Sequence, residues 1–131
     1  MTLDSSALVA ILFAEPGYLE LVDAILEADT VRVGAPTLVE TALVLTARRG
    51  KPALAELDAL IEELDVAVLP FGEAEYRKAA AAFTRYGRGR HRAALNFGDC
   101  LSYAAALSTG DTLLFVGDDF LKTDIAPARR A

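Results

Sequence analysis

Acidic side chains at separate places in the chain have the types and the setting for metal chemistry. Asp4 follows a very short apolar run at the N-terminus and precedes the first predicted helix. Asp118 and Asp119 directly follow the apolar run 113–116. Carboxylates placed just after strands lie at the edge of an open α/β sheet where such folds bind ligands. We therefore expect the rest of the chain to bring further acidic residues to Asp4.

Two more carboxylates lie in segments that otherwise lack charge. Glu40 is the only charged residue between Arg32 and Arg48, and it shares one face of a predicted helix with apolar side chains. Asp99 opens an apolar helix over 98–108 that has no other charge. A carboxylate on a buried face must be paired, protonated or metal-bound. The structural alternatives are a buried ion pair or the ragged end of an amphipathic pattern for Glu40, and an ordinary helix cap for Asp99.

Together these residues predict a divalent-metal site. All of their positions fall at one edge of a parallel sheet, where clustered carboxylates repel one another unless a cation neutralises them. Hard oxygen ligands, in a chain with one cysteine and one histidine, select Mg²⁺ or Mn²⁺ rather than zinc. Such an ion polarises a phosphoryl oxygen and activates water, so hydrolysis of phosphodiester bonds is the expected reaction, with either one ion or two.

A basic, glycine-containing loop over 87–96 leads directly into Asp99. The loop and the residues just before it combine guanidinium groups, which bind phosphates, with rings on which unpaired bases stack. The net charge of the chain is −6, so its affinity for phosphates is concentrated in this one place. A solvated, salt-bridged loop is the alternative. The residues predicted to bind nucleic acid, and RNA under the family resemblance described below, are Arg85, Arg88, Arg90, His91 and Arg92.

Length and patterning predict one α/β domain over residues 1–131. Helices are expected over 7–13 with Ser5 or Ser6 as N-cap, and over 18–28, 35–49, 52–64, 73–86 and 98–108. Strands are expected before Asp4 and over 30–34, 66–71 and 112–116, with a short edge strand over 123–125. The nearly continuous apolar run 66–71 is typical of a strand covered on both faces. This alternation predicts a three-layer α/β/α fold around a mainly parallel sheet of four to five strands.

The cellular setting follows from what the chain lacks. No apolar run approaches the roughly 18 residues that span a bilayer, and no signal peptide is apparent at the N-terminus. The single cysteine, Cys100, excludes an internal disulfide. These features predict a cytoplasmic protein with no membrane partner.

The acidic residues and their neighbours resemble those of PIN-domain ribonucleases, specifically the toxins of VapBC-type toxin–antitoxin pairs. The resemblance covers essentially the whole chain. Asp4, Glu40 and Asp99 look like the first three acidic residues of the family, and Asp119, which directly precedes Phe120, is preferred to Asp118 as the fourth. The segments that carry the resemblance are Leu3-Asp4-Ser5-Ser6-Ala7, Leu38-Val39-Glu40-Thr41-Ala42, Gly89 to Cys100 and Leu114 to Ile125.

The resemblance implies a Mg²⁺- or Mn²⁺-dependent endoribonuclease with a PIN-like, Rossmann-like fold. It also implies a homodimer and a cognate antitoxin that occludes the site. Under this hypothesis Asp4 and Asp99 bind the metal directly, and the carboxylates of Glu40 and Asp119 complete the pocket or hold its waters. Two other functions stay open: a catalytically silent PIN-like binding or scaffold module, and a DNA-directed structure-specific nuclease, because the same metal chemistry cuts either polymer.

Overall fold

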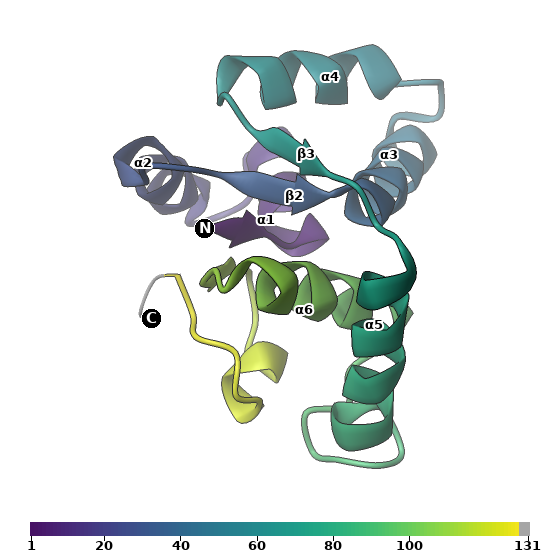
Figure 1. The fold of residues 1–131 in the computed structure, drawn as a ribbon. Coiled ribbons are helices and arrows are strands. Elements are labelled where there is room, and N and C mark those ends of the chain that lie inside the picture. The colour runs from purple at the N-terminus through teal and green to yellow at the C-terminus, as the bar shows by residue number, and fades with distance from the viewer. Residues whose placement is uncertain (129–131) are drawn as a thin grey trace.

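The computed structural model describes residues 1–128 and contains a four-stranded sheet between helices (Figure 1). In chain order the elements are β1 (Thr2–Leu3), α1 (Ser5–Leu12), α2 (Tyr18–Glu27), β2 (Arg32–Gly34), α3 (Ala35–Arg49), α4 (Leu54–Glu63), β3 (Ala67–Leu69), α5 (Glu73–Tyr86), α6 (Phe97–Thr109), β4 (Leu113–Leu114) and the 3-10 helix η1 (Asp119–Lys122). The strands run in the order β3-β2-β1-β4, and every pair is parallel. All carboxyl ends therefore lie at one edge of the sheet, which confirms the predicted α/β class.

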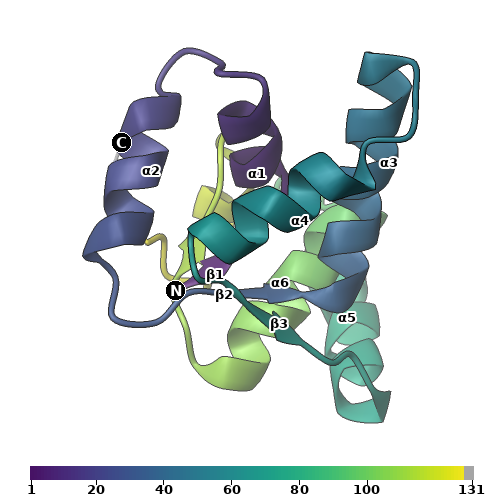
Figure 2. The same ribbon diagram turned by 90° about the horizontal axis from the view of Figure 1, so that it is seen from above.

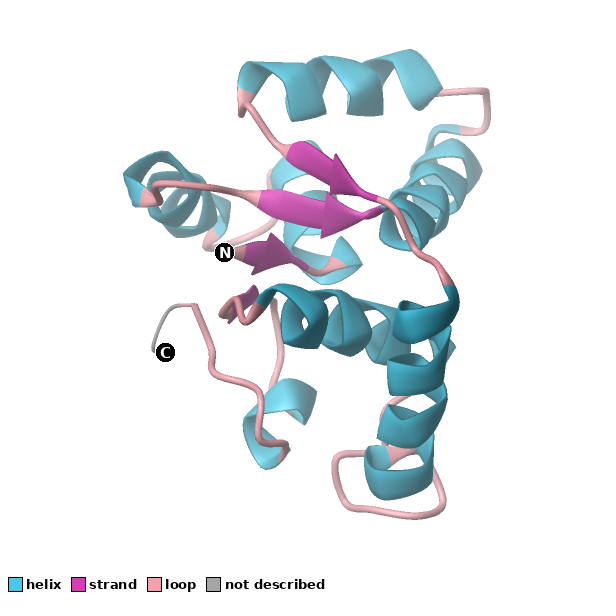
Figure 3. Cartoon of the chain, viewed as in Figure 1, coloured by secondary structure: helices cyan, strands magenta, loops and turns pink. Residues whose placement is uncertain are grey.

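Helices cover both faces of the sheet (Figures 2 and 3). On one face α1, α2 and the end of α4 pack against the strands in a cluster that includes Leu8, Ile25 and Val33. On the other face α5, α6 and the segment after β4 pack around Tyr103 and Phe115. The three-layer arrangement predicted from the alternation of strands and helices is thus present.

Helix α6 is the buried centre of the second layer. It contacts β1, β2 and β4 as well as α3 and α5. Its buried residues run almost without interruption from Gly98 to Ala106. The prediction that this apolar helix is buried is confirmed, and its burial carries Asp99 at its start toward the interior.

The first helix begins earlier than predicted, and its N-cap is a different residue. Helix α1 starts at Ser5 rather than Ala7, and its N-cap is Asp4 instead of Ser5 or Ser6. The Asp4 carboxylate accepts a hydrogen bond from the backbone N–H of Ser6. An aspartate caps a helix as well as a serine does, so the short β1 leads directly into α1.

Two predictions about strands are wrong. Strand β3 lies at the edge of the sheet and exposes Val68, so the run 66–71 is not covered on both faces. An apolar run alone does not distinguish an edge strand from a central one. The predicted strand over 123–125 is a turn, and the chain pairs with β4 two residues later, where Pro127 bridges to Leu113.

The amino-terminal edge of the sheet is fixed by a charged cluster. Asp111 accepts hydrogen bonds from Arg32 at 2.7 and 2.8 Å and from the Thr2 hydroxyl at 2.9 Å. Burial would raise the pKa of Asp111, but these bonds outweigh it and hold the pKa below its usual value. The cluster joins β1, β2 and the start of β4, and so it sets the register that brings their carboxyl ends together.

Within the described residues, no helix is long and apolar enough to cross a membrane.

Candidate active site

Asp4 is held at the carboxyl end of the central strand β1 by donors from two helices. Its side chain is 3% exposed. Oδ1 accepts a hydrogen bond from the Ser102 hydroxyl of α6 at 2.5 Å. Oδ2 accepts from the Ser6 hydroxyl at 2.5 Å and from the Ser6 backbone N–H at 3.1 Å. These donors fix both the place and the orientation of the carboxylate.

Asp99 forms the helix cap that the sequence offered as an alternative. Its Oδ2 accepts from the Asn96 backbone N–H at 3.1 Å, while Asn96 Oδ1 accepts from the Asp99 N–H at 2.9 Å. Burial raises the pKa of Asp99 to about 6, although the Asn96 bond opposes the shift. The charges of Asp4, Asp119 and Glu40 raise it further. Asp99 thus lies within electrostatic reach of the other three predicted carboxylates at this edge of the sheet.

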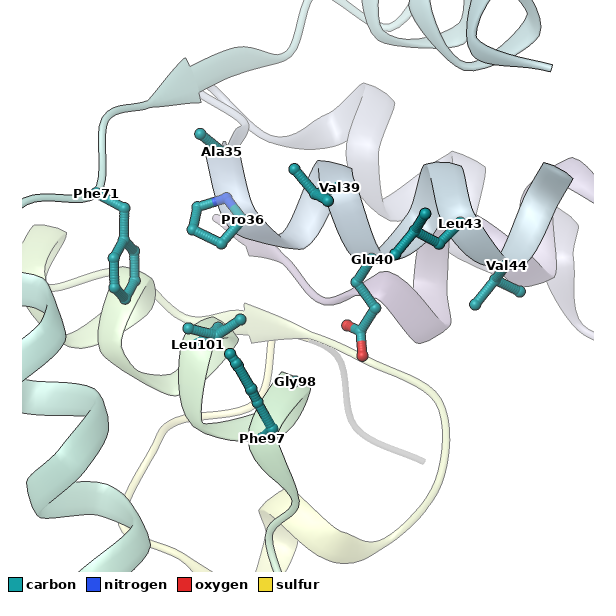
Figure 4. A pocket seen from close by; sticks show the side chains of 10 residues that line it. All are labelled: Ala35, Pro36, Val39, Glu40, Leu43, Val44, Phe71, Phe97, Gly98 and Leu101. Carbon is teal, nitrogen blue, oxygen red and sulfur yellow. The ribbon is translucent and has the colours of Figure 1, made fainter. Parts of the chain in front are cut away.

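Glu40 points from α3 toward the first turn of α6 (Figure 4). Gly98 makes room for it, since a Cβ at Gly98 would lie only 2.6 Å from Glu40 Cδ. Glu40 Oε1 is buried, and it has no hydrogen-bond partner among residues 1–128. Residues 1–128 also give Glu40 no ion pair, so the buried ion pair raised as an alternative for it is not present in the described part of the chain. A buried carboxylate oxygen without a donor is costly unless a cation or water meets it.

The loop after β4 is tied to Asp4 and carries the last two carboxylates. Asp4 donates its backbone N–H to the carbonyl of Leu114 at 2.9 Å, and Val116 donates its N–H to the Ser6 hydroxyl at 3.0 Å. Asp118 and Asp119 are both exposed. Of the two, Asp119 is the one whose charge raises the pKa of Asp99.

The donor set fits a hard divalent ion in its chemistry. It consists of carboxylates, and it includes the unpartnered Oε1 of Glu40. Mg²⁺ and Mn²⁺ prefer such oxygen ligands. Within residues 1–128, no three carboxylate, thiol or imidazole side chains lie close enough to hold an ion as they stand. An ion held by three of these residues would therefore require at least one side chain to move from its present position.

An apolar groove of about 740 Å³ lies beside the carboxylates, between α3 and α6 (Figure 4). Its wall includes Val39, Leu43, Phe97 and Leu101, and of its lining residues only Glu40 is charged. Val39, Leu43 and Phe97 are among the exposed large apolar side chains. The groove thus leads from an exposed apolar surface to the acidic edge of the sheet.

Three arginines of the basic loop lie free on the surface. Arg88, Arg90 and Arg92 are exposed and make no ion pair within the described part of the chain. The guanidinium of Arg90 lies 5.8 Å from the centre of the Phe83 ring. This geometry leaves all three guanidinium groups available to phosphates.

The other two residues predicted to bind RNA are engaged within the fold. Arg85 pairs with Asp124 at 3.2 Å and lies 4.7 Å from the centre of the Tyr86 ring, so the salt-bridged alternative holds for this residue. His91 is half-buried, and its Nδ1 accepts from the backbone N–H of Ala93 at 3.0 Å. Its ring also packs edge-on against Tyr86. His91 thus stabilises the conformation of the loop through these two contacts.

The sequence matches the PIN domain over residues 1–126. The chain belongs to the PIN-domain family. Ribonuclease VapC30 of Mycobacterium tuberculosis is 46% identical over 127 residues, which cover 96% of either chain. Ribonuclease VapC of Mycolicibacterium smegmatis is 44% identical over 127 residues, 96% of this chain and 98% of that protein. At this identity and coverage the chain belongs to the VapC ribonucleases, as its motifs suggested.

Solved structures share the fold of this PIN domain. The crystal structure of Mycobacterium tuberculosis VapC20, described as a sarcin-ricin loop cleaving toxin, matches with a TM-score of 0.77, 19% identity and 95% coverage of both chains. VapBC2 from Rickettsia felis, bound to a DNA fragment from their promoter, matches with a TM-score of 0.75 and 14% identity over 96% of this chain and 94% of that one. At these identities the comparison supports the architecture alone.

Several residues that organise this PIN-domain site were not among those predicted from the sequence. Ser102 is fully buried and donates to Asp4, and Thr37 lies 3.4 Å from it, hydroxyl to hydroxyl. Gly98 accommodates Glu40, and Asn96 orients Asp99. The available signal was a hydroxyl inside an otherwise apolar helix, which is unusual enough to indicate a buried polar partner.

The raised pKa of Asp99 predicts a pH-dependent stability for the metal-free PIN domain. The pKa of Asp99 is about 6 in the fold against 3.8 ordinarily, so the folded state holds this proton more tightly than the unfolded chain. Asp99 therefore contributes stability that is fully present below about pH 4 and is lost as the pH rises through about 6. We expect the melting temperature of the wild type, measured in EDTA, to fall relative to that of Asp99→Asn as the pH rises over that range. A difference that does not change with pH would contradict this environment for Asp99.

Proposed function

We propose that this protein is a metal-dependent endoribonuclease toxin of the VapC type, neutralised by a cognate antitoxin and acting in the cytoplasm. The observation that carries the proposal is the surroundings of Asp99. Three other carboxylates act on it at the carboxyl edge of the sheet, and Glu40 has a buried oxygen without a partner. Relatives named ribonuclease VapC, 44 to 46% identical to nearly the whole chain, support it.

The proposed ligands of Mg²⁺ or Mn²⁺ are Asp4 and Asp99, with Glu40 and Asp119 completing the pocket. When bound, the ion supplies Lewis-acid polarisation of a phosphoryl oxygen and a water of lowered pKa. Ser6 and Ser102 hold the Asp4 carboxylate in a fixed orientation.

Glu40 is the residue proposed to orient the attacking water. Its Oε1 is buried and has no donor among the described residues. A carboxylate oxygen in that state accepts a hydrogen bond from a water molecule and takes up its proton as attack begins. Gly98 permits this position because it places no side chain in the path of Glu40.

The antitoxin is proposed to enter along the apolar groove. The groove offers apolar walls from α3 and α6 and one charged lining residue, Glu40. An apolar antitoxin segment that carries a basic side chain matches this surface in both hydropathy and charge. Such a segment would cover the carboxylates and exclude RNA. We further propose that the functional toxin is a homodimer.

Cleavage of defined oligonucleotides tests the proposal. We expect the purified protein to cut single-stranded RNA in Mg²⁺ or Mn²⁺, to lose that activity in EDTA, and to leave the matched DNA oligonucleotide intact. Cutting that persists in EDTA would contradict the metal-dependent mechanism. Equal cutting of the DNA would favour the DNA-directed nuclease, and binding of RNA without cutting would favour a silent binding module.

The exposed arginines predict that the affinity for RNA depends on salt concentration. Replacing Arg88, Arg90 and Arg92 by alanine removes up to three phosphate contacts, which should lower the slope of log affinity against log salt by about 2 for a single strand. Fluorescence anisotropy of a labelled oligonucleotide across a KCl series measures this slope. Arg77→Ala is the matched control, because Arg77 is an exposed arginine of α5 that pairs with Glu73. An unchanged slope in the triple variant would show that RNA binds elsewhere.

A further inference from the structure

Protein donors occupy most of the hydrogen-bond-accepting positions of the Asp4 carboxylate. An ionised carboxylate has about four lone-pair positions, two on each oxygen. Oδ2 accepts from both the hydroxyl and the backbone N–H of Ser6. Among residues 1–128, Oδ1 accepts only from the hydroxyl of Ser102. One position therefore stays open, and it belongs to Oδ1.

Both hydroxyls are held in the donating orientation by a further group behind them. The Val116 backbone N–H donates to Ser6 Oγ at 3.0 Å, so the Ser6 proton is directed at Asp4. Thr37 Oγ1 lies 3.4 Å from Ser102 Oγ. Since the Ser102 proton is given to Asp4, Thr37 is the donor of that pair. Rotation of either serine away from Asp4 would be unfavourable. It would leave the Val116 N–H without its acceptor in the case of Ser6, and the Thr37 hydroxyl without its acceptor in the case of Ser102.

We propose that Ser6 determines which metal ions Asp4 accepts, by occupying Oδ2 and limiting Asp4 to binding through the single oxygen Oδ1. This inference rests on the proposed function, in which Asp4 is a metal ligand. Mg²⁺ and Mn²⁺ take octahedral shells and are satisfied by one oxygen from each carboxylate, whereas Ca²⁺ takes six to eight oxygens and readily uses both oxygens of one carboxylate. A carboxylate restricted to one oxygen therefore disfavours Ca²⁺. Ser6 is a specificity-determining residue, and Ser102, on the other oxygen, fixes the orientation of Asp4.

The two serines allow a matched comparison. In Ser6→Ala the Oδ2 atom keeps only the backbone N–H, so both oxygens of Asp4 have an open position. In Ser102→Ala the freed position is on Oδ1, which was already open, so Asp4 still has no free position on Oδ2. Calorimetric titration of each variant with Mn²⁺ and with Ca²⁺, without RNA, measures the ratio of the two affinities. We expect Ser6→Ala to raise the affinity for Ca²⁺ relative to Mn²⁺ by about tenfold, the value of one hydrogen bond to a charged group. Ser102→Ala should leave the ratio within about twofold of the wild type.

Further variants separate this effect from damage to the fold. Ser6→Thr keeps the hydroxyl and should restore the wild-type ratio. Ser6→Cys keeps a side chain of similar size with a weak donor, and it replaces Ser6→Ala if that variant does not fold. An unchanged ratio in Ser6→Ala or Ser6→Cys, or the same change in the Ser6 and Ser102 variants, would overturn the inference. Failure of the wild type to bind Mn²⁺ at all would instead overturn the proposed metal site.

Discussion

Replacing Asp99 by asparagine is expected to reduce metal-dependent RNA cleavage by about a hundredfold or more while the protein stays folded. The substitution removes the negative charge on which Asp4, Glu40 and Asp119 act. The amide oxygen can still accept the Asn96 N–H, so the cap of α6 is retained. The loss is therefore chemical rather than structural. Initial rates on a labelled RNA oligonucleotide, with circular dichroism of the same sample, measure both properties.

Asp118→Asn is the matched control for this experiment. Asp118 is an exposed carboxylate next to Asp119, but its charge is not among those that raise the pKa of Asp99. We expect Asp118→Asn to cleave at close to the wild-type rate. If Asp118→Asn were inactive and Asp99→Asn fully active, the assignment of the site would be wrong.

Gly98→Ala is expected to impair cleavage by at least about tenfold without loss of stability. Its Cβ would lie 2.6 Å from Glu40 Cδ, so the carboxylate must swing away from the first turn of α6. The fold tolerates this because the displaced group is the end of a flexible side chain. Alanine also favours a helix by about 1 kcal/mol over glycine. Gly98→Ala should therefore lower the cleavage rate without lowering the melting temperature.

Gly72→Ala provides the comparison for Gly98→Ala. A Cβ at Gly72 meets nothing nearer than Glu75 Oε2 at 3.7 Å, and Gly72, at the start of α5, does not itself line the groove, although its neighbour Phe71 does. This variant should retain full activity. Wild-type cleavage by Gly98→Ala would contradict the role given to Glu40.

Most of the scaffold could be predicted because its signals are local. Helix α5 begins and ends at the predicted residues, Glu73 and Tyr86, and α3 ends before Gly50, which adopts the left-handed conformation that glycine favours. Helix periodicity, caps and breakers act over a few residues, so the sequence displays them directly. The convergence of distant carboxylates at one edge followed from the parallel topology rather than from any local pattern.

What could not be predicted depends on partners far away in the chain. The hydroxyl of Ser102 serves a carboxylate 98 residues earlier, and no spacing rule connects the two. The exposure of β3 depends on strand order, since Val68 would be buried in a central strand. The turn at 123–125 forms because the Thr123 hydroxyl donates to the Phe120 carbonyl at 2.7 Å, and this turn postpones the pairing to Pro127.

Diffraction from crystals soaked in Mn²⁺, recorded with anomalous scattering, tests the central claim most directly. We expect an anomalous peak at the carboxyl edge of the sheet, bound by Asp4 Oδ1 and by the Asp99 carboxylate, with Glu40 and Asp119 facing it. A peak only at other surface carboxylates, or no peak at saturating Mn²⁺, would contradict the claim that these acidic residues form one metal site.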